Sequence, residues 1–92
     1  MVCRSVTVTN RLGLHARAAA KFVHLASRFH SHVAVSKGSQ TMDGKSIMGI
    51  LLLAAANGSV VTVSTNGEDE QAALDALCGF IETGFGEDTC SA

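Results

Sequence analysis

The residue with the most evident capacity for chemistry is His15, which comes directly before a stretch of helical spacing that begins at Ala16. The first turn of a helix presents backbone N–H groups without partners inside the helix and carries a partial positive charge, so it attracts anions. The same charge disfavours an imidazolium ion, so we expect His15 to be neutral and nucleophilic. Gly13 lets the preceding loop bend sharply, and the guanidinium group of Arg17 could clamp an anion. The predicted chemistry is attachment of a phosphoryl group to an imidazole nitrogen, facing the N–H groups of Ala16 and Arg17.

Spacing alone leaves a second interpretation of His15 open. A histidine before a helix is most often a helix cap or an ordinary surface residue. The other histidines, His24, His30 and His32, have no carboxylate or cysteine at the spacing of metal ligands, so the sequence predicts no metal site. We likewise expect no cofactor.

The elements that must position His15 follow from the spacing of the apolar residues. Alternation predicts a strand over 3–9, and a change to helical spacing predicts a helix over 16–27. Ser46 is the expected N-cap of a short helix, and Glu68, Asp69 and Glu70 are expected to load the first turn of the last helix. In chain order, the expected elements are strands at 3–9, around Val33 and Val35, at 40–42 and at 60–65, with helices at 16–27, at 47–53 and from about Glu68 to Gly84, the last with a buried stripe of Leu74, Leu77, Cys78 and Ile81.

This order, β-α-β-β-α-β-α, predicts an α+β protein. Helices with one apolar stripe pack naturally against one face of a mostly antiparallel sheet. The chain has 92 residues, of which 47% are hydrophobic, and this is enough for the core of one small domain.

Charge is distributed unevenly along the chain. All seven Lys and Arg residues lie between Arg4 and Lys45, and seven of the eight acids lie between Glu68 and Asp88. The basic residues are scattered, and the aromatic residues among them, Phe22 and Phe29, belong to the apolar face of the predicted helical spacing, so we expect no nucleic-acid partner.

Membrane association and secretion are also not expected. The longest apolar run, 47–56, is about half as long as a membrane span, and no signal peptide is visible. Cys3, Cys78 and Cys90 are far apart and form no CxxC pair, which indicates reduced thiols in a cytoplasmic protein.

Three blocks of the sequence together resemble one known family. The first is Gly13-Leu14-His15-Ala16-Arg17, followed by Ala19-Ala20-Lys21-Phe22-Val23; the second is Lys45-Ser46-Ile47-Met48-Gly49-Ile50-Leu51; and the third is Gly67-Glu68-Asp69-Glu70-Gln71-Ala72-Ala73. They are similar to the HPr family, the histidine phosphocarriers of the phosphoenolpyruvate-dependent phosphotransferase system, in register from residue 2 to about 85. The resemblance implies an open-faced β-sandwich, in which three helices cover one face of a four-stranded antiparallel sheet. We therefore expect one HPr-like domain over 1–86, with a loose tail over 87–92.

The resemblance also implies a function. His15 would accept a phosphoryl group on Nδ1 from phosphorylated enzyme I and pass it to an enzyme IIA-type acceptor, either sugar-specific or of a nitrogen branch. The protein would be a carrier and not an enzyme. Ser46 would be the substrate of an HPr kinase/phosphorylase. The alternative is a regulatory binding module, in which the phosphorylation state switches partner affinity without flux into sugar transport.

The family resemblance further implies a docking surface beside His15. Its apolar members have core packing as their alternative role, but a small apolar patch with a basic rim suits brief contact with acidic partners. We expect a monomer. The predicted docking residues are Ala20, Lys21, His24, Lys45, Ile47, Met48 and Leu51.

One departure from the family concerns Ala18, which stands where the family usually has proline. Proline has a fixed φ and no N–H group. Ala18 gives up that fixed φ but restores a backbone N–H at the anion site, so it joins Ala16 and Arg17 as a candidate phosphate contact. We predict that phosphoryl transfer survives this change.

Overall fold

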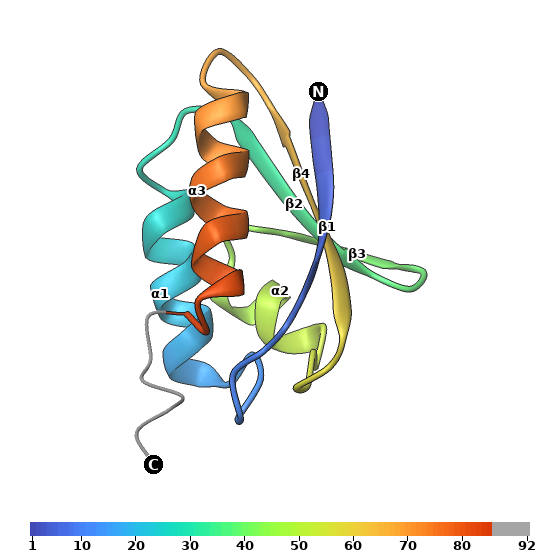
Figure 1. The fold of residues 1–92 in the computed structure, drawn as a ribbon. Helices are drawn as coiled ribbons and strands as arrows, with labels where there is room; N and C mark the ends of the chain where they lie inside the picture. The colour runs from blue at the N-terminus through green and yellow to red at the C-terminus, as the bar shows by residue number, and fades with distance from the viewer. Residues whose placement is uncertain (86–92) are drawn as a thin grey trace.

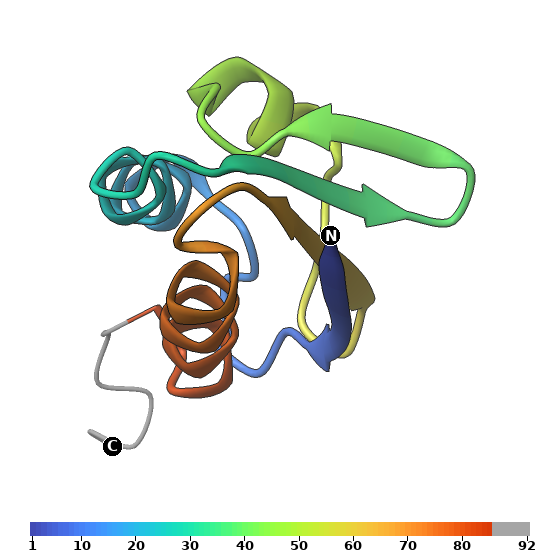
Figure 2. The ribbon, with the colours of Figure 1, turned by 90° about the horizontal axis from the view of Figure 1, so that it is seen from above.

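The sheet has the strand order β1-β4-β2-β3 in the computed structural model, which describes residues 1–85. Every pair of neighbouring strands is antiparallel, and the helices cover one face of the sheet (Figures 1 and 2). The expected α+β open-faced sandwich is therefore confirmed, whereas the expected tail at 87–92 lies outside the described residues. The elements are β1 (Val2–Thr7), α1 (Ala16–Ala26), β2 (His32–Lys37), β3 (Gln40–Asp43), α2 (Ile47–Leu52), β4 (Val60–Asn66) and α3 (Glu70–Glu82).

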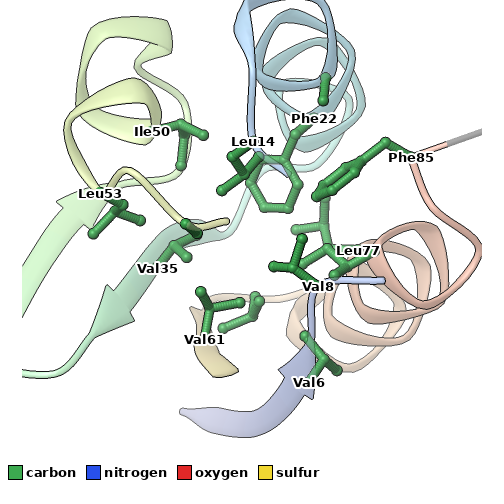
Figure 3. Close-up of a cluster of buried hydrophobic side chains, with 14 of the residues drawn as sticks. Val6, Val8, Leu14, Phe22, Val35, Ile50, Leu53, Val61, Leu77 and Phe85 are labelled. Carbon is green, nitrogen blue, oxygen red and sulfur yellow. The ribbon is translucent and has the colours of Figure 1, made fainter. Parts of the chain in front are cut away.

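The core lies between the sheet and the helices and consists mainly of aliphatic side chains. Alternation in the strands turns Val6, Val35 and Val61 toward the helices, where Figure 3 shows them around Phe22 and Leu77. Val6 faces Val61 directly across the β1–β4 ladder, so the two strands contribute adjacent side chains to the same face.

Two long helices lie side by side over the sheet and run in opposite directions (Figure 1), while the shorter α2 packs near β3 (Figure 2). Ala18, Ala19 and Ala26 of α1 are fully buried, and their small side chains allow close packing around Phe22. The predicted stripe of α3 is also confirmed, since all four of its members are buried: Leu74, Leu77, Cys78 and Ile81.

The start of α3 differs from the sequence prediction. The helix begins at Glu70, so Glu68 and Asp69 precede it, and the Asp69 side chain makes no capping bond to α3. Instead, the Asp69 carboxylate accepts hydrogen bonds from the hydroxyl and backbone N–H of Ser31 and from the N–H of His30. Asp69 therefore ties the loop between α1 and β2 to the start of α3.

These hydrogen bonds make Asp69 a determinant of acid stability. The Ser31 hydroxyl, followed by the His30 N–H, lowers the pKa of Asp69 from 3.8 to about 2. A carboxylate whose pKa is depressed in the folded state stabilises the protein above its unfolded pKa, and this contribution disappears as the pH falls from 3.8 toward 2. We expect Asp69→Asn to lower the urea midpoint at pH 7 and to flatten its decline over this acidic range. Glu68→Gln removes the same charge from the same turn and should leave the decline in place; equal pH profiles for the two variants would contradict this role of Asp69.

Candidate phosphoryl-acceptor site

His15 is the N-cap residue of α1, with an extended backbone at φ −79° and ψ 178°. Its Nδ1 atom accepts a hydrogen bond from the backbone N–H of Ala18 at 3.1 Å, and its carbonyl accepts one from Ala19 at 2.8 Å. The ring is half-buried at the mouth of the helix. Because Nδ1 is a hydrogen-bond acceptor, it carries a lone pair and no proton in this arrangement.

The loop before His15 is held against the segment that follows α2. Gly13 has a φ of +67°, and a Cβ atom placed on it would lie 2.5 Å from the carbonyl oxygen of Ala55. The next residue, Leu14, donates its N–H to that same carbonyl at 2.8 Å and buries its side chain in the core (Figure 3). Glycine is therefore required for close backbone approach as well as for the bend.

Two asparagines that sequence analysis did not single out complete this anchorage. The amide of Asn10 donates to the carbonyl of Gly13 at 2.8 Å, and the amide of Asn57 donates to the carbonyls of Thr9 and Asn10 at 3.0 and 2.9 Å. By its sequence, the pair Asn57-Gly58 is typical only of a turn. Nothing local in the sequence indicates that its amide reaches a loop formed by residues much earlier in the chain.

The surroundings of His15 favour a negatively charged group. The first turn of α1 contains no acidic residue, and the side chain of Arg17 within this turn is exposed. The N–H groups of Ala16 and Arg17 belong to the part of a helix that has no acceptors inside the helix. His15, these N–H groups and the arginine together can accept a phosphoryl group and stabilise its charge.

Ser46 is the N-cap of α2, as predicted, and its hydroxyl oxygen accepts the N–H of Gly49 at 3.1 Å. At the other end of this short helix, the Lys37 ammonium donates to the carbonyls of Leu53 and Ala54 at 3.3 and 3.2 Å. A helix of six residues is weak by itself, so these two interactions at its ends help to fix it.

Several predicted docking residues lie on open surface. Ala20, Lys21 and His24 line a groove of about 630 Å³. On α2, the side chains of Ile47 and Met48 are 45% and 67% exposed. Residues that sequence analysis did not single out also line this groove or lie exposed: Leu25, Arg28, Phe80 and Phe85 line the groove, and Leu52 is 58% exposed on α2.

Two further docking candidates are placed differently. The ammonium of Lys45 donates to the carbonyl of Phe29 at 2.7 Å, so it is held by the loop after α1. Leu51 is half-buried and packs against the core. The helical spacing of 47–53 could not show which apolar side chains point outward, because α2 is apolar nearly all round.

Within residues 1–85, no group of three or more His, Cys, Asp and Glu side chains could hold a metal ion. Among the same residues, no helix is long and apolar enough to cross a membrane. Cys78 lies on the buried face of α3, and burial raises the pKa of its thiol.

Comparisons of this chain with a family model, with known relatives and with solved structures all identify the same family. Residues 2–83 match the family model described as the phosphorylation site of the HPr component of the phosphotransferase system. The phosphocarrier protein HPr of Cupriavidus necator is 52% identical, with 95% of this chain and 98% of the relative covered. A crystal structure of HPr from Thermoanaerobacter tengcongensis matches with a TM-score of 0.91 and 44% identity, covering 96% of this chain and 99% of that one. A crystal structure of an HPr dimer from the same organism matches with a TM-score of 0.75 and 46% identity, covering 89% of this chain and 94% of that one.

Together with the fold and the histidine at the mouth of α1, these matches define a group-carrying protein of the phosphotransferase system. The chain belongs to the HPr family of phosphocarrier proteins. Its role in that system is to carry phosphoryl groups and interact with the system's enzymes, not to catalyse a reaction of its own. These matches do not favour the alternative of a regulatory binding module whose phosphorylation state switches partner affinity without flux into sugar transport.

Proposed function

We propose that His15 is the residue that carries the phosphoryl group and that Nδ1 is the atom that accepts it. The observation that carries this proposal is the hydrogen bond that Nδ1 accepts from the backbone N–H of Ala18 in the first turn of α1. In the transfer, a bond forms between Nδ1 and phosphorus while the bond from phosphorus to the donor breaks. The electron pair of the broken bond returns to the donor, and the proton on Nε2 of His15 stays in place.

The phosphorylated ring would be stabilised by groups around the helix mouth. The N–H groups of Ala16 and Arg17 supply hydrogen bonds from a rigid backbone, and the guanidinium of Arg17 supplies a mobile positive charge. Ala18 adds a third N–H in the same turn. Positioning and charge neutralisation are the main requirements of phosphoryl transfer, and this set of groups provides both.

The proposed partners are enzyme I as the donor and an enzyme IIA-type protein as the acceptor. Both would dock on the surface beside His15, where the groove residues Ala20, Lys21 and His24 lie on α1 and the exposed Ile47 and Met48 on α2. An apolar centre with basic neighbours suits partners that must bind briefly and release. We propose that the protein acts as a monomer in the cytoplasm.

The direct test is incubation with phosphoenolpyruvate and enzyme I, followed by measurement of the intact mass. The mass should rise by one phosphoryl group, and brief acid treatment should remove it, because phosphohistidine is acid-labile and phosphoserine is not. A protein that gains no mass, or gains only an acid-stable group, would contradict the proposal.

Arg17→Gln is expected to slow phosphoryl uptake from enzyme I by roughly 10- to 100-fold, the range for losing a hydrogen bond to a charged group. The variant keeps the backbone N–H of residue 17 and loses only the guanidinium. Rapid-quench measurement of phosphoprotein formation gives the rate. Arg11→Gln is the matched control, since Arg11 is also exposed but lies in the preceding loop. Equal rates for the two variants would show that the Arg17 guanidinium does not stabilise the phosphoryl group during transfer.

Ser46 is proposed as a regulatory phosphorylation site for an HPr kinase/phosphorylase. Negative charge is tolerated at a helix N-cap, so the modification should leave α2 intact. It would place that charge next to Ile47 and Met48 of the docking surface, where it opposes an acidic partner.

Ser46→Asp is therefore expected to reduce phosphoryl uptake from enzyme I by about tenfold, through a higher KM and with little change in the urea midpoint. Ser39→Asp adds the same charge in the exposed turn between β2 and β3, and uptake by this control should stay near that of the unmodified protein. Steady-state transfer with both variants separates a local effect from one of net charge. An unchanged KM for Ser46→Asp would reject this regulation.

A further inference from the structure

The backbone N–H of Ala18 has a role that a proline at this position could not fill. We propose that this N–H has two acceptors in turn. It donates to Nδ1 of His15 in the free protein, and it donates to a phosphoryl oxygen once Nδ1 is phosphorylated. This inference rests on the proposed function of His15 and adds a positioning residue to it.

The first acceptor is Nδ1 of His15, to which the Ala18 N–H donates at 3.1 Å. Neutral imidazole carries its proton on one of two nitrogens, and the partner of each nitrogen selects the tautomer. A donor at Nδ1 favours the tautomer with the lone pair on Nδ1 and the proton on Nε2, which is the form that can attack phosphorus at Nδ1. The Ala18 N–H thus prepares the nucleophile, at the cost of occupying its lone pair.

The second acceptor, a phosphoryl oxygen, follows from the transfer itself. When Nδ1 bonds to phosphorus its lone pair is used, so the Ala18 N–H must find another acceptor. Ala18 is fully buried, and its N–H faces the helix mouth where the phosphoryl oxygens would lie. A hydrogen bond to a charged oxygen is stronger than one to a neutral nitrogen. The exchange therefore favours the phosphorylated form and gives the carrier one more backbone donor than a chain with proline would have.

The first half of the proposal can be tested on the unmodified protein. With ¹⁵N labelling, a scalar coupling across the hydrogen bond between the Ala18 amide nitrogen and Nδ1 of His15 should be detectable. After phosphorylation, the coupling should vanish and the Ala18 amide proton should begin to respond to titration of the phosphoryl group. Absence of the coupling, or an Ala18 amide that does not change on phosphorylation, overturns the proposal.

The second half is tested by Ala18→Pro, with Ala18→Gly as the control that keeps the N–H. The first turn of a helix tolerates proline, and proline is usual in the family here. The equilibrium between enzyme I and the carrier should shift about 3- to 10-fold against the phosphorylated carrier in Ala18→Pro. Ala18→Gly should shift it much less. Equal equilibria for the two variants overturn the proposal.

Failure of the proposed function would look different. In that case the unmodified protein would take no acid-labile phosphoryl group from enzyme I or from phosphoramidate, a small donor that needs no docking. If Ala18→Pro fails to fold, the coupling in the free protein still decides whether the amide holds Nδ1, and its loss on phosphorylation still decides the exchange.

Discussion

His15→Asn is expected to abolish phosphoryl uptake completely while leaving the fold intact. Asparagine is among the preferred N-cap residues, so it can keep the bond to the first turn of α1 that the imidazole makes now. It has no nucleophilic nitrogen, so no covalent intermediate can form. After incubation with phosphoenolpyruvate and enzyme I, the intact mass of the variant should be unchanged.

Another histidine should not take over this role. His24 lies in the last turn of α1, where the helix dipole is negative and opposes a phosphate. His32 is exposed at the start of β2 and is not the N-cap residue of any described helix. His32→Ala is the matched control and should be phosphorylated at the rate of the unmodified protein. An acid-labile phosphoryl group on His15→Asn would show that the acceptor lies elsewhere.

Gly13→Ala is expected to have the largest effect on stability and to impair transfer as well. The new Cβ would meet the Ala55 oxygen at 2.5 Å and the Ala56 Cα at 2.8 Å, in a backbone conformation of φ +67° that alanine adopts with strain. Either the loop or the 55–56 segment must move, and His15 moves with the loop. We expect a loss of about 2–4 kcal/mol in the free energy of unfolding, measured with urea, and a phosphoryl uptake reduced by roughly tenfold or more.

Gly38→Ala separates the cost of a positive φ from the cost of the close approach to Ala55. Gly38 has nearly the same φ, +60°, but an added Cβ there meets no atom of the described residues within 4 Å. This control carries the conformational cost alone, about 1–2 kcal/mol, and lies in the β2–β3 turn. Its phosphoryl uptake should be unchanged. If both variants lose the same stability and the same activity, close approach to Ala55 is not what holds the site.

Much of this architecture could be predicted from short-range patterns in the sequence. Alternating Val6 and Val8 located the first strand, and the spacing of Ala19, Phe22 and Ala26 located α1. These patterns succeed because burial of one face imposes a period of two on a strand and 3.6 on a helix. Ser46 was also identified, because an N-cap is recognised from its immediate neighbours.

The interactions that could not be predicted join side chains to distant backbone. Asp69 was expected to interact with the dipole of the last helix, but its carboxylate accepts hydrogen bonds from the N–H and hydroxyl of Ser31. Asn57 resembled a turn residue, but its amide reaches Asn10. Such bonds have no period and no local composition, so only the folded arrangement reveals them. For the same reason, Lys45 was expected on an open rim and is held instead by the carbonyl of Phe29.

Because β4 lies between β1 and β2 in the sheet, the phosphoryl-acceptor site can form only after the chain has been synthesised as far as β4. β1 is synthesised well before β4, yet it pairs with β4, as Val6 does with Val61. The loop that carries His15 is likewise fastened to Ala55 and Asn57. Contacts this distant in sequence form late and together, since the intervening chain must close first. A nascent chain that ends before β4 therefore contains the nucleophile without its site, so incomplete chains on the ribosome should not draw phosphoryl groups away from finished ones.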